Sequence, residues 1–366
     1  MKFGFSEEQN LLREHVRRYV GDQFSSESVR RLSGDRDSLR AAWLGFCDLG
    51  CLGSAVAEAD GGLGLGWVDL VIILEEVGRA LCPLPIVSQL VSIAAIAEFG
   101  TPDIKARWLQ SLIDGSNVMV PALSGSPHRS DDPAADICSV EEEDSFALSG
   151  TMNFVGDLDL ADLFLVASID AAGAPRLAIV AAGETDFACQ PTYDLTKPIG
   201  TLRLDAVSVA REDTIPVTAE QLQKILDYGA LCVTAEAVGA AEAALQLTAD
   251  YARQRFQFGS PIGRFQGVKH PLADMYVDLE SMKSLTQWAS LTADGDPATF
   301  PKAVSLAKAL ASDAFNSLTI ECVNLHGAMG FTEEYDIQLF LKRAKWFRPA
   351  FGDAAYHYVR SARMDA

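Results

Sequence analysis

The spacing of hydrophobic and polar positions changes twice along this chain, and each change predicts a domain boundary. Up to residue 117, apolar positions recur at helical steps between glycine and proline breaks, which predicts an N-terminal helical domain over 1–117. From 118 to 215 the apolar runs are short and β-like, with turn residues between them, which predicts an antiparallel β domain. Helical spacing returns over 216–366 and predicts a C-terminal four-helix bundle. The expected fold class is therefore α+β.

The same pattern predicts bounds for individual elements. In the first domain we expect helices around 43–52 and 68–77, and Ser6 is expected to cap the first helix. The expected strands are 137–140, 145–148, 163–169, 177–181 and 202–209. The expected bundle helices are 219–254, 265–293, 301–326 and 335–348, with a short last helix after Gly352.

The corner between the first two bundle helices carries candidate chemistry. Gly259 can take the left-handed conformation that ends the first helix, and a second helix is expected after Phe265. Arg255 then lies at the corner, where its guanidinium group can bind a pyrophosphate while Phe256 and Phe258 offer flat apolar surface. The alternative is a surface arginine beside two core phenylalanines. Apolar residues of the second helix are expected to form one buried stripe, namely Val268, Leu272, Met275, Leu279 and Met282.

Composition narrows the classes of partner. The chain has 366 residues, 49% of them hydrophobic, and a net charge of −20, which disfavours nucleic acid and anionic membranes because both require a basic surface. Its 7 cysteines show no Cys-x-x-Cys pair, so no metal site is expected. The N-terminus has no apolar segment of signal-peptide length, and no stretch is long and apolar enough to span a bilayer, which predicts a cytoplasmic protein.

The residue order around the corner, Arg-x-x-Phe-Gly-x-Pro-Ile-x-x-Phe-Gln, resembles the flavin-binding signature of the acyl-CoA dehydrogenase family. The order of a helical domain, a β domain and a four-helix bundle is also that of this family. The resemblance implies FAD as the cofactor. It implies FAD contacts in this stretch from Arg255, Phe258, Phe265 and Gln266.

A second stretch, residues 324–335 with the sequence Asn-Leu-His-Gly-Ala-Met-Gly-Phe-Thr-Glu-Glu-Tyr, resembles the family's loop that reaches across a dimer interface to the neighbouring subunit's FAD. Asn324 stands where the usual pattern has Gln, and Ala328 stands at its second Gly. His326 is expected to be a packed or capping residue. The resemblance implies cofactor contacts from Asn324, Gly327, Ala328 and Gly330.

Matches in the other two domains are more partial. In the β domain, Phe154 and Gly156 replace the Trp and Thr that line the flavin in the family, and Ser124 stands where the family usually has the Thr of Ala-Leu-Thr-Glu-Pro. Ser124 and Phe154 are still implied FAD contacts. In the first domain, residues 75–85 resemble a branch often encoded beside partner subunits for the degradation of bulky CoA thioesters such as steroid side chains.

The catalytic carboxylate implied by the resemblance is missing from both of its usual places. Dehydrogenation of an acyl-CoA requires a base for the α-proton. In most of the family this is a Glu after the last long helix, and Phe351 falls on that position. In a minority it lies ten residues before the glycine of Ala-Val-Gly, and Gly229 falls there. The backbone N–H of Phe351 survives, and in the family that group polarises the thioester carbonyl.

Three carboxylates of this chain are candidates for the missing base. Glu236 lies two helical turns beyond Gly229, among small apolar residues, and the alternative for it is a structural ion pair. Asp353 is equally suited to capping the final helix. Glu321 precedes His326 on the third bundle helix, and a structural role is favoured there as well.

The expected function is therefore FAD-dependent α,β-dehydrogenation of an acyl-CoA thioester, with electrons passed to an electron-transfer flavoprotein. The alternative is a non-catalytic subunit that binds FAD and assembles into a heterotetramer whose partner supplies the base. A flavin-dependent oxidase or oxygenase on the same fold is a third reading. The sequence leaves a homotetramer and a heterotetramer equally open.

Overall fold

The structure is a computed structural model that describes residues 4–124 and 136–364. The chain divides into two compact units. The first unit comprises Met1–Arg30, Trp67–Cys82 and Ala230–Ala366, and the second comprises Arg31–Gly66 and Pro83–Gly229. The expected domain bounds at 117 and 215 stay a prediction.

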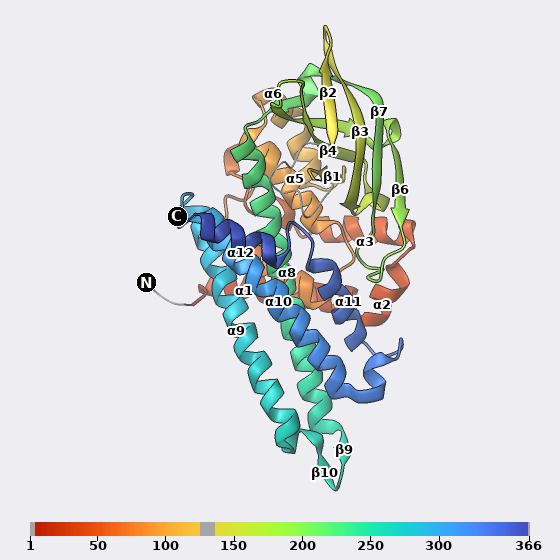
Figure 1. Ribbon diagram of the computed structural model, residues 1–366, viewed down its shortest axis with the longest axis vertical. Coiled ribbons are helices and arrows are strands. Elements are labelled where there is room, and N and C mark those ends of the chain that lie inside the picture. Colours follow the sequence, from red (N-terminus) through yellow and green to blue (C-terminus); the bar gives the residue numbers. More distant parts are fainter. Residues whose placement is uncertain (1–3, 125–135, 365–366) are drawn as a thin grey trace. The chain divides into compact units, whose positions relative to one another are not determined.

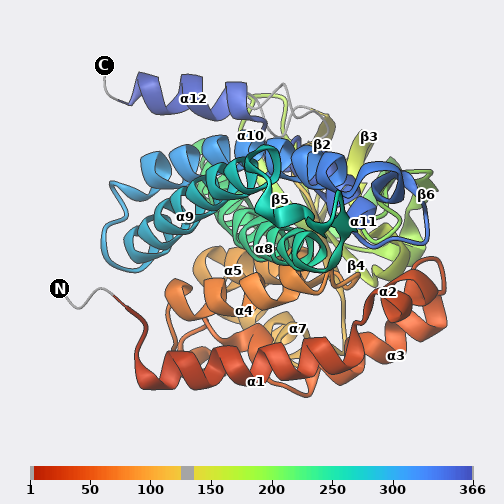
Figure 2. The ribbon, with the colours of Figure 1, turned by 90° about the horizontal axis from the view of Figure 1, so that it is seen from below.

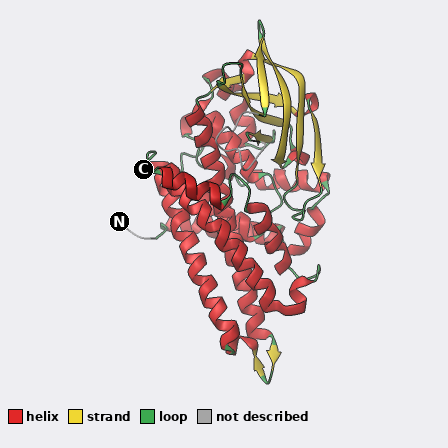
Figure 3. Cartoon of the chain, in the orientation of Figure 1, coloured by secondary structure: helices red, strands yellow, loops and turns green. Residues whose placement is uncertain are grey.

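The first unit is helical apart from one short hairpin (Figures 1 and 3). Helix α10 packs on α9, α11 and α12. The predicted C-terminal helical bundle is confirmed, with every bound within two residues of the expected one. The helices are α1 (Glu7–Gln23), α4 (Trp67–Arg79), α8 (Ala219–Gln254, which begins in the second unit), α9 (Gln266–Gly295), α10 (Phe300–His326), α11 (Ile337–Phe347) and α12 (Ala354–Arg363).

Helix starts follow the capping residues of the sequence. Ser6 caps α1 as predicted, and Ser6 and Gln9 form a reciprocal capping box. Asp353 caps α12 by accepting a hydrogen bond from the backbone N–H of Tyr356. The expected buried stripe on α9 is present at Met275, Leu279 and Met282, whereas its first two members, at the exposed end of the helix, are half-buried.

Helices α4 and α8 touch through their backbones. A Cβ atom at Gly78 would lie 1.9 Å from the carbonyl oxygen of Glu236, and one at Gly239 would lie 1.7 Å from that of Glu75. Both positions therefore require glycine. On its other side α4 packs against α1, so that α4 lies between α1 and α8 (Figure 2).

The second unit is built on an eight-stranded sheet with the order β6-β7-β3-β2-β4-β5-β8, and β1 pairs with β4 off this path. Most neighbours are antiparallel, but β1 and β2 each pair with β4 in parallel. The predicted antiparallel β domain is confirmed for most of the sheet, and these two contacts are its parallel exceptions. The strands are β1 (Met119–Ala122), β2 (Ile137–Glu141), β3 (Ser145–Gly156), β4 (Leu163–Ile169), β5 (Pro175–Ala181), β6 (Asp186–Gln190), β7 (Ile199–Ala210) and β8 (Thr214–Pro216).

Helices of the second unit cover the β1 region of the sheet. Helix α5 packs on β1, and the side-chain amide of Gln89 donates to the carbonyls of Leu112 and Asn117 while its oxygen accepts from the Met119 N–H. The helix expected at 43–52 is displaced, because α3 ends at Cys47 and Gly50 turns the chain with a φ of +69°. The helices are α2 (Ser26–Leu32, shared with the first unit), α3 (Arg36–Cys47), α5 (Ile86–Phe99), α6 (Pro102–Ile104), a π-turn (Lys105–Leu109) and α7 (Gln110–Ile113).

Among the described helices, only α8 is long and apolar enough to cross a membrane by length and composition. However, 78% of its apolar window is buried inside the protein. An apolar helix buried in this way is typical of a protein core.

Candidate functional site

The corner after α8 is a β-hairpin rather than a simple helix end. Strands β9 (Phe256–Gln257) and β10 (Ser260–Pro261) pair antiparallel, with Phe258 and Gly259 as the two loop residues. Their φ values are +54° and +77°, the signature of a type I′ turn. The prediction that Gly259 ends α8 is wrong, because α8 already ends at Gln254 and the left-handed glycine serves the hairpin turn instead.

Aromatic rings on this hairpin face solvent. Phe258 is 92% exposed, Phe256 is 60% exposed and Phe265 is 38% exposed. The rings of Phe258 and Phe265 meet edge to face, with centroids 6.1 Å apart. The alternative of two core phenylalanines is therefore wrong. Exposed aromatic surface of this kind is typical of a surface that contacts a ligand or another chain.

Arg255 carries the positive charge beside these rings. Its backbone N–H donates to Tyr251 and its carbonyl accepts from Ile262, which fixes the main chain at the start of the hairpin. The Arg255 side chain is exposed and makes no ion pair within residues 4–124 and 136–364. Gln266, also exposed, is the first residue of α9. A guanidinium group without a carboxylate, beside exposed rings, fits an aromatic ligand that carries phosphate.

The second predicted cofactor segment is joined to the end of α8. The ring of His326 stacks on that of Tyr251, with centroids 4.4 Å apart, and also contacts Tyr335. His326 is buried, and its Nδ1–H donates to the Cys322 carbonyl at 2.7 Å. Burial lowers the pKa of His326. This is the packed role that we expected for it.

After His326 the chain forms a 3₁₀ turn, Gly327–Phe331. Asn324, Gly327 and Ala328 are exposed, whereas Gly330 is buried and a Cβ there would lie 2.5 Å from the Val323 carbonyl oxygen. Phe331 adds a further exposed ring. The structure thus brings the two predicted cofactor segments of the first unit to one end of its helices.

The remaining two predicted cofactor residues belong to the second unit. Phe154 is 59% exposed and has a φ of +60°, in β3 where the pairing with β7 shifts register between Met152 and Val155. A bulge of this kind changes the direction in which a side chain points, here that of Phe154. Ser124 is half-buried, and Gly125 and Ser126 of the same motif lie outside the described residues.

The three candidate bases all have other partners. Glu236 and Arg343 are 3% and 2% exposed, with Oε2 and Nη1 at 4.0 Å. Arg343 also donates to the Leu81 carbonyl at 3.3 Å. Asp353 caps α12, and Glu321 accepts from the side chain of Asn324 at 3.4 Å. For Glu236 and Asp353, the contacts are those of the structural alternatives.

Phe351 lies in the loop between α11 and α12. Its φ is +53°, a left-handed conformation that a bulky residue rarely adopts. Its carbonyl accepts from Nε2 of His357 at 2.9 Å. Its N–H has no acceptor within the described part of the chain. The loop therefore presents one unused backbone donor at the position of the expected base.

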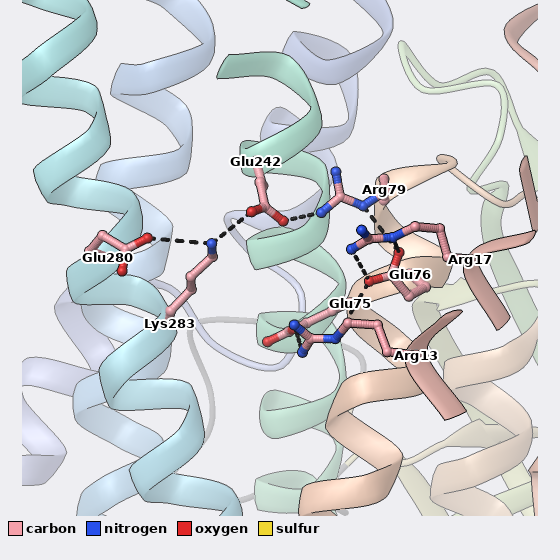
Figure 4. A network of polar contacts seen from close by, with 8 residues as sticks. All are labelled: Arg13, Arg17, Glu75, Glu76, Arg79, Glu242, Glu280 and Lys283. Atoms are coloured by element: carbon pink, nitrogen blue, oxygen red, sulfur yellow. Dashed lines mark hydrogen bonds and ion pairs between the residues drawn. The ribbon is translucent and has the colours of Figure 1, made fainter. Parts of the chain in front are cut away.

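A cluster of ionisable groups joins four helices of the first unit (Figure 4). Arg13 bonds Glu75 at 2.6 Å, and Arg17 grips Glu76 with two bonds of 2.7 and 2.8 Å. Arg79 bridges Glu76 and Glu242, and Lys283 forms ion pairs with Glu242 and Glu280. Burial raises the pKa of Glu75 to about 7, against the opposing effect of Arg13. The motif at residues 75–79 thus ties α1, α4, α8 and α9 together.

Comparison with known proteins identifies the family. Acyl-CoA dehydrogenase IpdE2 of Mycolicibacterium smegmatis is 30% identical over 348 residues, which are 93% of each chain. The chain belongs to the acyl-CoA dehydrogenase family. The family models for the acyl-CoA dehydrogenase N-terminal and C-terminal domains match residues 6–116 and 219–363.

Solved acyl-CoA dehydrogenases share the fold. The ChsE4-ChsE5 complex from Mycobacterium tuberculosis has a TM-score of 0.90 and 28% identity, covering 99% of this chain and 98% of that one. A variant of the steroid ACAD Tcur3481-Tcur3483 has a TM-score of 0.87 and 29% identity, covering 98% of both chains. A glutaryl-CoA dehydrogenase from Mycobacterium smegmatis was solved with FADH2, at 20% identity, a TM-score of 0.88 and coverage of 98% of this chain and 94% of that one.

Proposed function

We propose that this chain is a FAD-binding subunit of an acyl-CoA dehydrogenase that acts on a bulky thioester such as a steroid side chain, and that a partner subunit supplies the carboxylate base. The observation that carries the proposal is the state of the candidate bases. Phe351 occupies the expected position of the base. Glu236 forms an ion pair with Arg343, and Asp353 caps α12. The relatives described as a steroid ACAD and as a two-protein complex support the substrate class and the partner.

The exposed hairpin is the part of this chain that would hold FAD. Arg255 would bind the diphosphate, and Phe258, Phe265 and Gln266 would cover the adenine half. Residues 324–330 would contact the FAD of a neighbouring subunit. Bound FAD would supply a hydride acceptor for the β-hydrogen of the acyl group, and an electron-transfer flavoprotein would take up the electrons.

The loop at Phe351 would hold the thioester. Its unused N–H can donate to the thioester carbonyl and stabilise the negative charge that develops there when the α-proton leaves. A phenyl group cannot take that proton. The proton therefore goes to a carboxylate outside this chain.

The test compares this chain alone with its complex with the product of a neighbouring gene, under anaerobic conditions. We expect the isolated FAD-loaded chain to keep its colour when a steroid side-chain CoA thioester is added, and the complex to bleach. Glu236→Gln in the complex should leave bleaching unchanged. Phe351→Glu should give the isolated chain bleaching of its own, because it restores a carboxylate at the expected position.

Three results would overturn this proposal. Bleaching by the isolated wild-type chain that disappears in Glu236→Gln would place the base on α8. A purified chain that binds no FAD, even with its partner, would remove the cofactor and the function together. Rapid peroxide formation in air would instead indicate an oxidase.

A further inference from the structure

The loop between α11 and α12 is held by a fully buried lysine. Nζ of Lys308, from the middle of α10, lies 3.2 Å from the carbonyl oxygens of both Phe347 and Arg348 and 3.0 Å from that of Gly352. The hydroxyl of Ser312 is 2.9 Å away. Four oxygens around one nitrogen offer acceptors for all three hydrogens of an ammonium group, while burial lowers the pKa of Lys308 to about 7. Lys308 therefore fixes both ends of the loop.

A buried histidine holds the middle of the same loop. Nε2 of His357, on α12, lies 2.9 Å from the Phe351 carbonyl oxygen. Because a carbonyl only accepts, Nε2 carries the hydrogen and the ring donates. Burial lowers the pKa of His357 to about 3, and the nearby charge of Lys308 acts in the same direction, so the ring is neutral at physiological pH.

These contacts leave the N–H of Phe351 unused. The N–H groups of Ala350 and Gly352 donate to the carbonyls of Phe347 and Pro349. The carbonyls of Phe351 and Gly352 accept from His357 and Lys308. The N–H of Phe351 has no partner among the described residues.

The backbone at Gly352 leaves no room for a side chain. Its φ is +97°, and a Cβ there would lie 2.6 Å from the Tyr356 ring and 2.8 Å from Nε2 of His357. Residue 352 is therefore restricted to glycine, and the neighbouring Phe351 has a left-handed conformation that the contacts of Lys308 and His357 hold in place. A fixed donor of this kind stabilises developing charge without reorganisation.

We propose that Lys308 and His357 are positioning residues that aim the Phe351 N–H at the carbonyl oxygen of a bound acyl-CoA thioester. This rests on the proposed function, in which this chain holds the thioester. The two side chains do not touch the substrate. They act by holding the carbonyls on either side of the donor, so that the N–H points in one direction.

The experiment measures the thioester carbonyl directly. A steroid side-chain CoA thioester with an isotopically labelled carbonyl is bound to the FAD-loaded complex, and its stretching frequency is read by difference infrared spectroscopy. We expect a shift to lower frequency in the wild type. His357→Leu and Lys308→Met should reduce that shift and weaken thioester binding about tenfold, because a displaced donor forms a poorer hydrogen bond.

Two further variants separate positioning from stability. His357→Gln keeps a donor near the place of Nε2 and should recover most of the shift. Leu279→Ala removes a buried side chain of α9 that takes no part in the hydrogen bonds of the loop, and should lower stability while keeping the full shift. Lys308→Met remains as a second probe if His357→Leu does not fold.

The outcomes distinguish this inference from the proposed function. A wild-type shift that survives in both His357→Leu and Lys308→Met would show that the two residues only stabilise the fold, and would overturn the inference alone. A wild-type complex that binds the thioester without any carbonyl shift, or does not bind it, would overturn the proposed function and the inference with it.

Discussion

Glu236→Gln separates a structural ion pair from a relocated base, and the structure supplies the expected size of its effect. Glu236 and Arg343 are both buried, with 4.0 Å between Oε2 and Nη1. Two unit charges at that distance attract by about 4 kcal/mol at an effective dielectric constant of about 20. Neutralising one partner leaves the other charge buried, which typically costs about 3–5 kcal/mol. We therefore expect Glu236→Gln to lower the free energy of unfolding by about 3 kcal/mol.

A double-mutant cycle tests whether this loss belongs to the pair. Arg343→Met should cost a similar amount, since it leaves the Glu236 carboxylate in the same buried place. The double variant should lose much less than the sum of the two, because no isolated charge remains. Urea unfolding followed by circular dichroism measures all four proteins.

Two results would refute this reasoning. If Glu236→Gln unfolds at the wild-type urea concentration, the pair does not stabilise the unit. If the two single variants simply add, Glu236 and Arg343 act independently. In either case the structural account of Glu236 fails, and its carboxylate returns as a candidate base.

Three further variants test the ionisable cluster, the loop and the helix crossing. The pKa of Glu75 is raised to about 7, so the native state holds a proton that the unfolded state releases near pH 4.5, and stability falls as pH rises across that window. Glu75→Gln should remove about 3 kcal/mol of this change in the free energy of unfolding, measured by urea unfolding across the pH window. An unchanged pH dependence would contradict the buried carboxyl. The pKa of His357 is lowered to about 3, so stability falls as pH drops from 6.5 towards 3. His357→Gln should remove up to about 5 kcal/mol of this acid sensitivity, and thermal unfolding at pH 4 and pH 7 measures it. Gly239→Ala should lower the free energy of unfolding by about 1–3 kcal/mol or more, because its methyl group meets the Glu75 backbone. The control Gly21→Ala on α1 has open space around it and should be neutral or stabilising. Equal melting temperatures for the two variants would disprove the close crossing of α4 and α8.

The helical bundle was predictable because its signals are long and repeated. Over the 36 residues of α8 and the 30 of α9, apolar spacing outweighs any single exception. Strand β4, with seven residues that are nearly all buried, was likewise predicted at its observed bounds. Local pattern and packing agree in these elements.

The elements that the sequence did not reveal are short or lie at edges. Strands β6 and β8 are the two edges of the sheet, and β6 is almost entirely exposed, so neither needs a run of apolar residues. Strand β1 has four residues and contains Pro121. The hairpin turns on Phe258-Gly259 rather than Asn-Gly, so no standard turn signal marks it.

The candidate site was also predictable from the sequence only in part. Residue order alone pointed to Arg255 and its neighbouring rings. The structure adds that they face solvent, with no carboxylate partner for Arg255 among the described residues. The loop clamp of Lys308 and His357 was invisible in the sequence. It depends on one nitrogen meeting carbonyls about forty residues away, which no spacing rule encodes.

The crossing of α4 and α8 has a consequence for how relatives of this chain diverge. The two helices present the same pattern, Glu75-Glu-Val-Gly78 and Glu236-Ala-Val-Gly239, and each glycine faces the carbonyl of the first residue of the other pattern. Neither glycine can gain a side chain unless the opposite helix moves. We expect the two tetrapeptides, although more than 150 residues apart, to change together or not at all. An alignment of relatives should therefore show correlated variation between them.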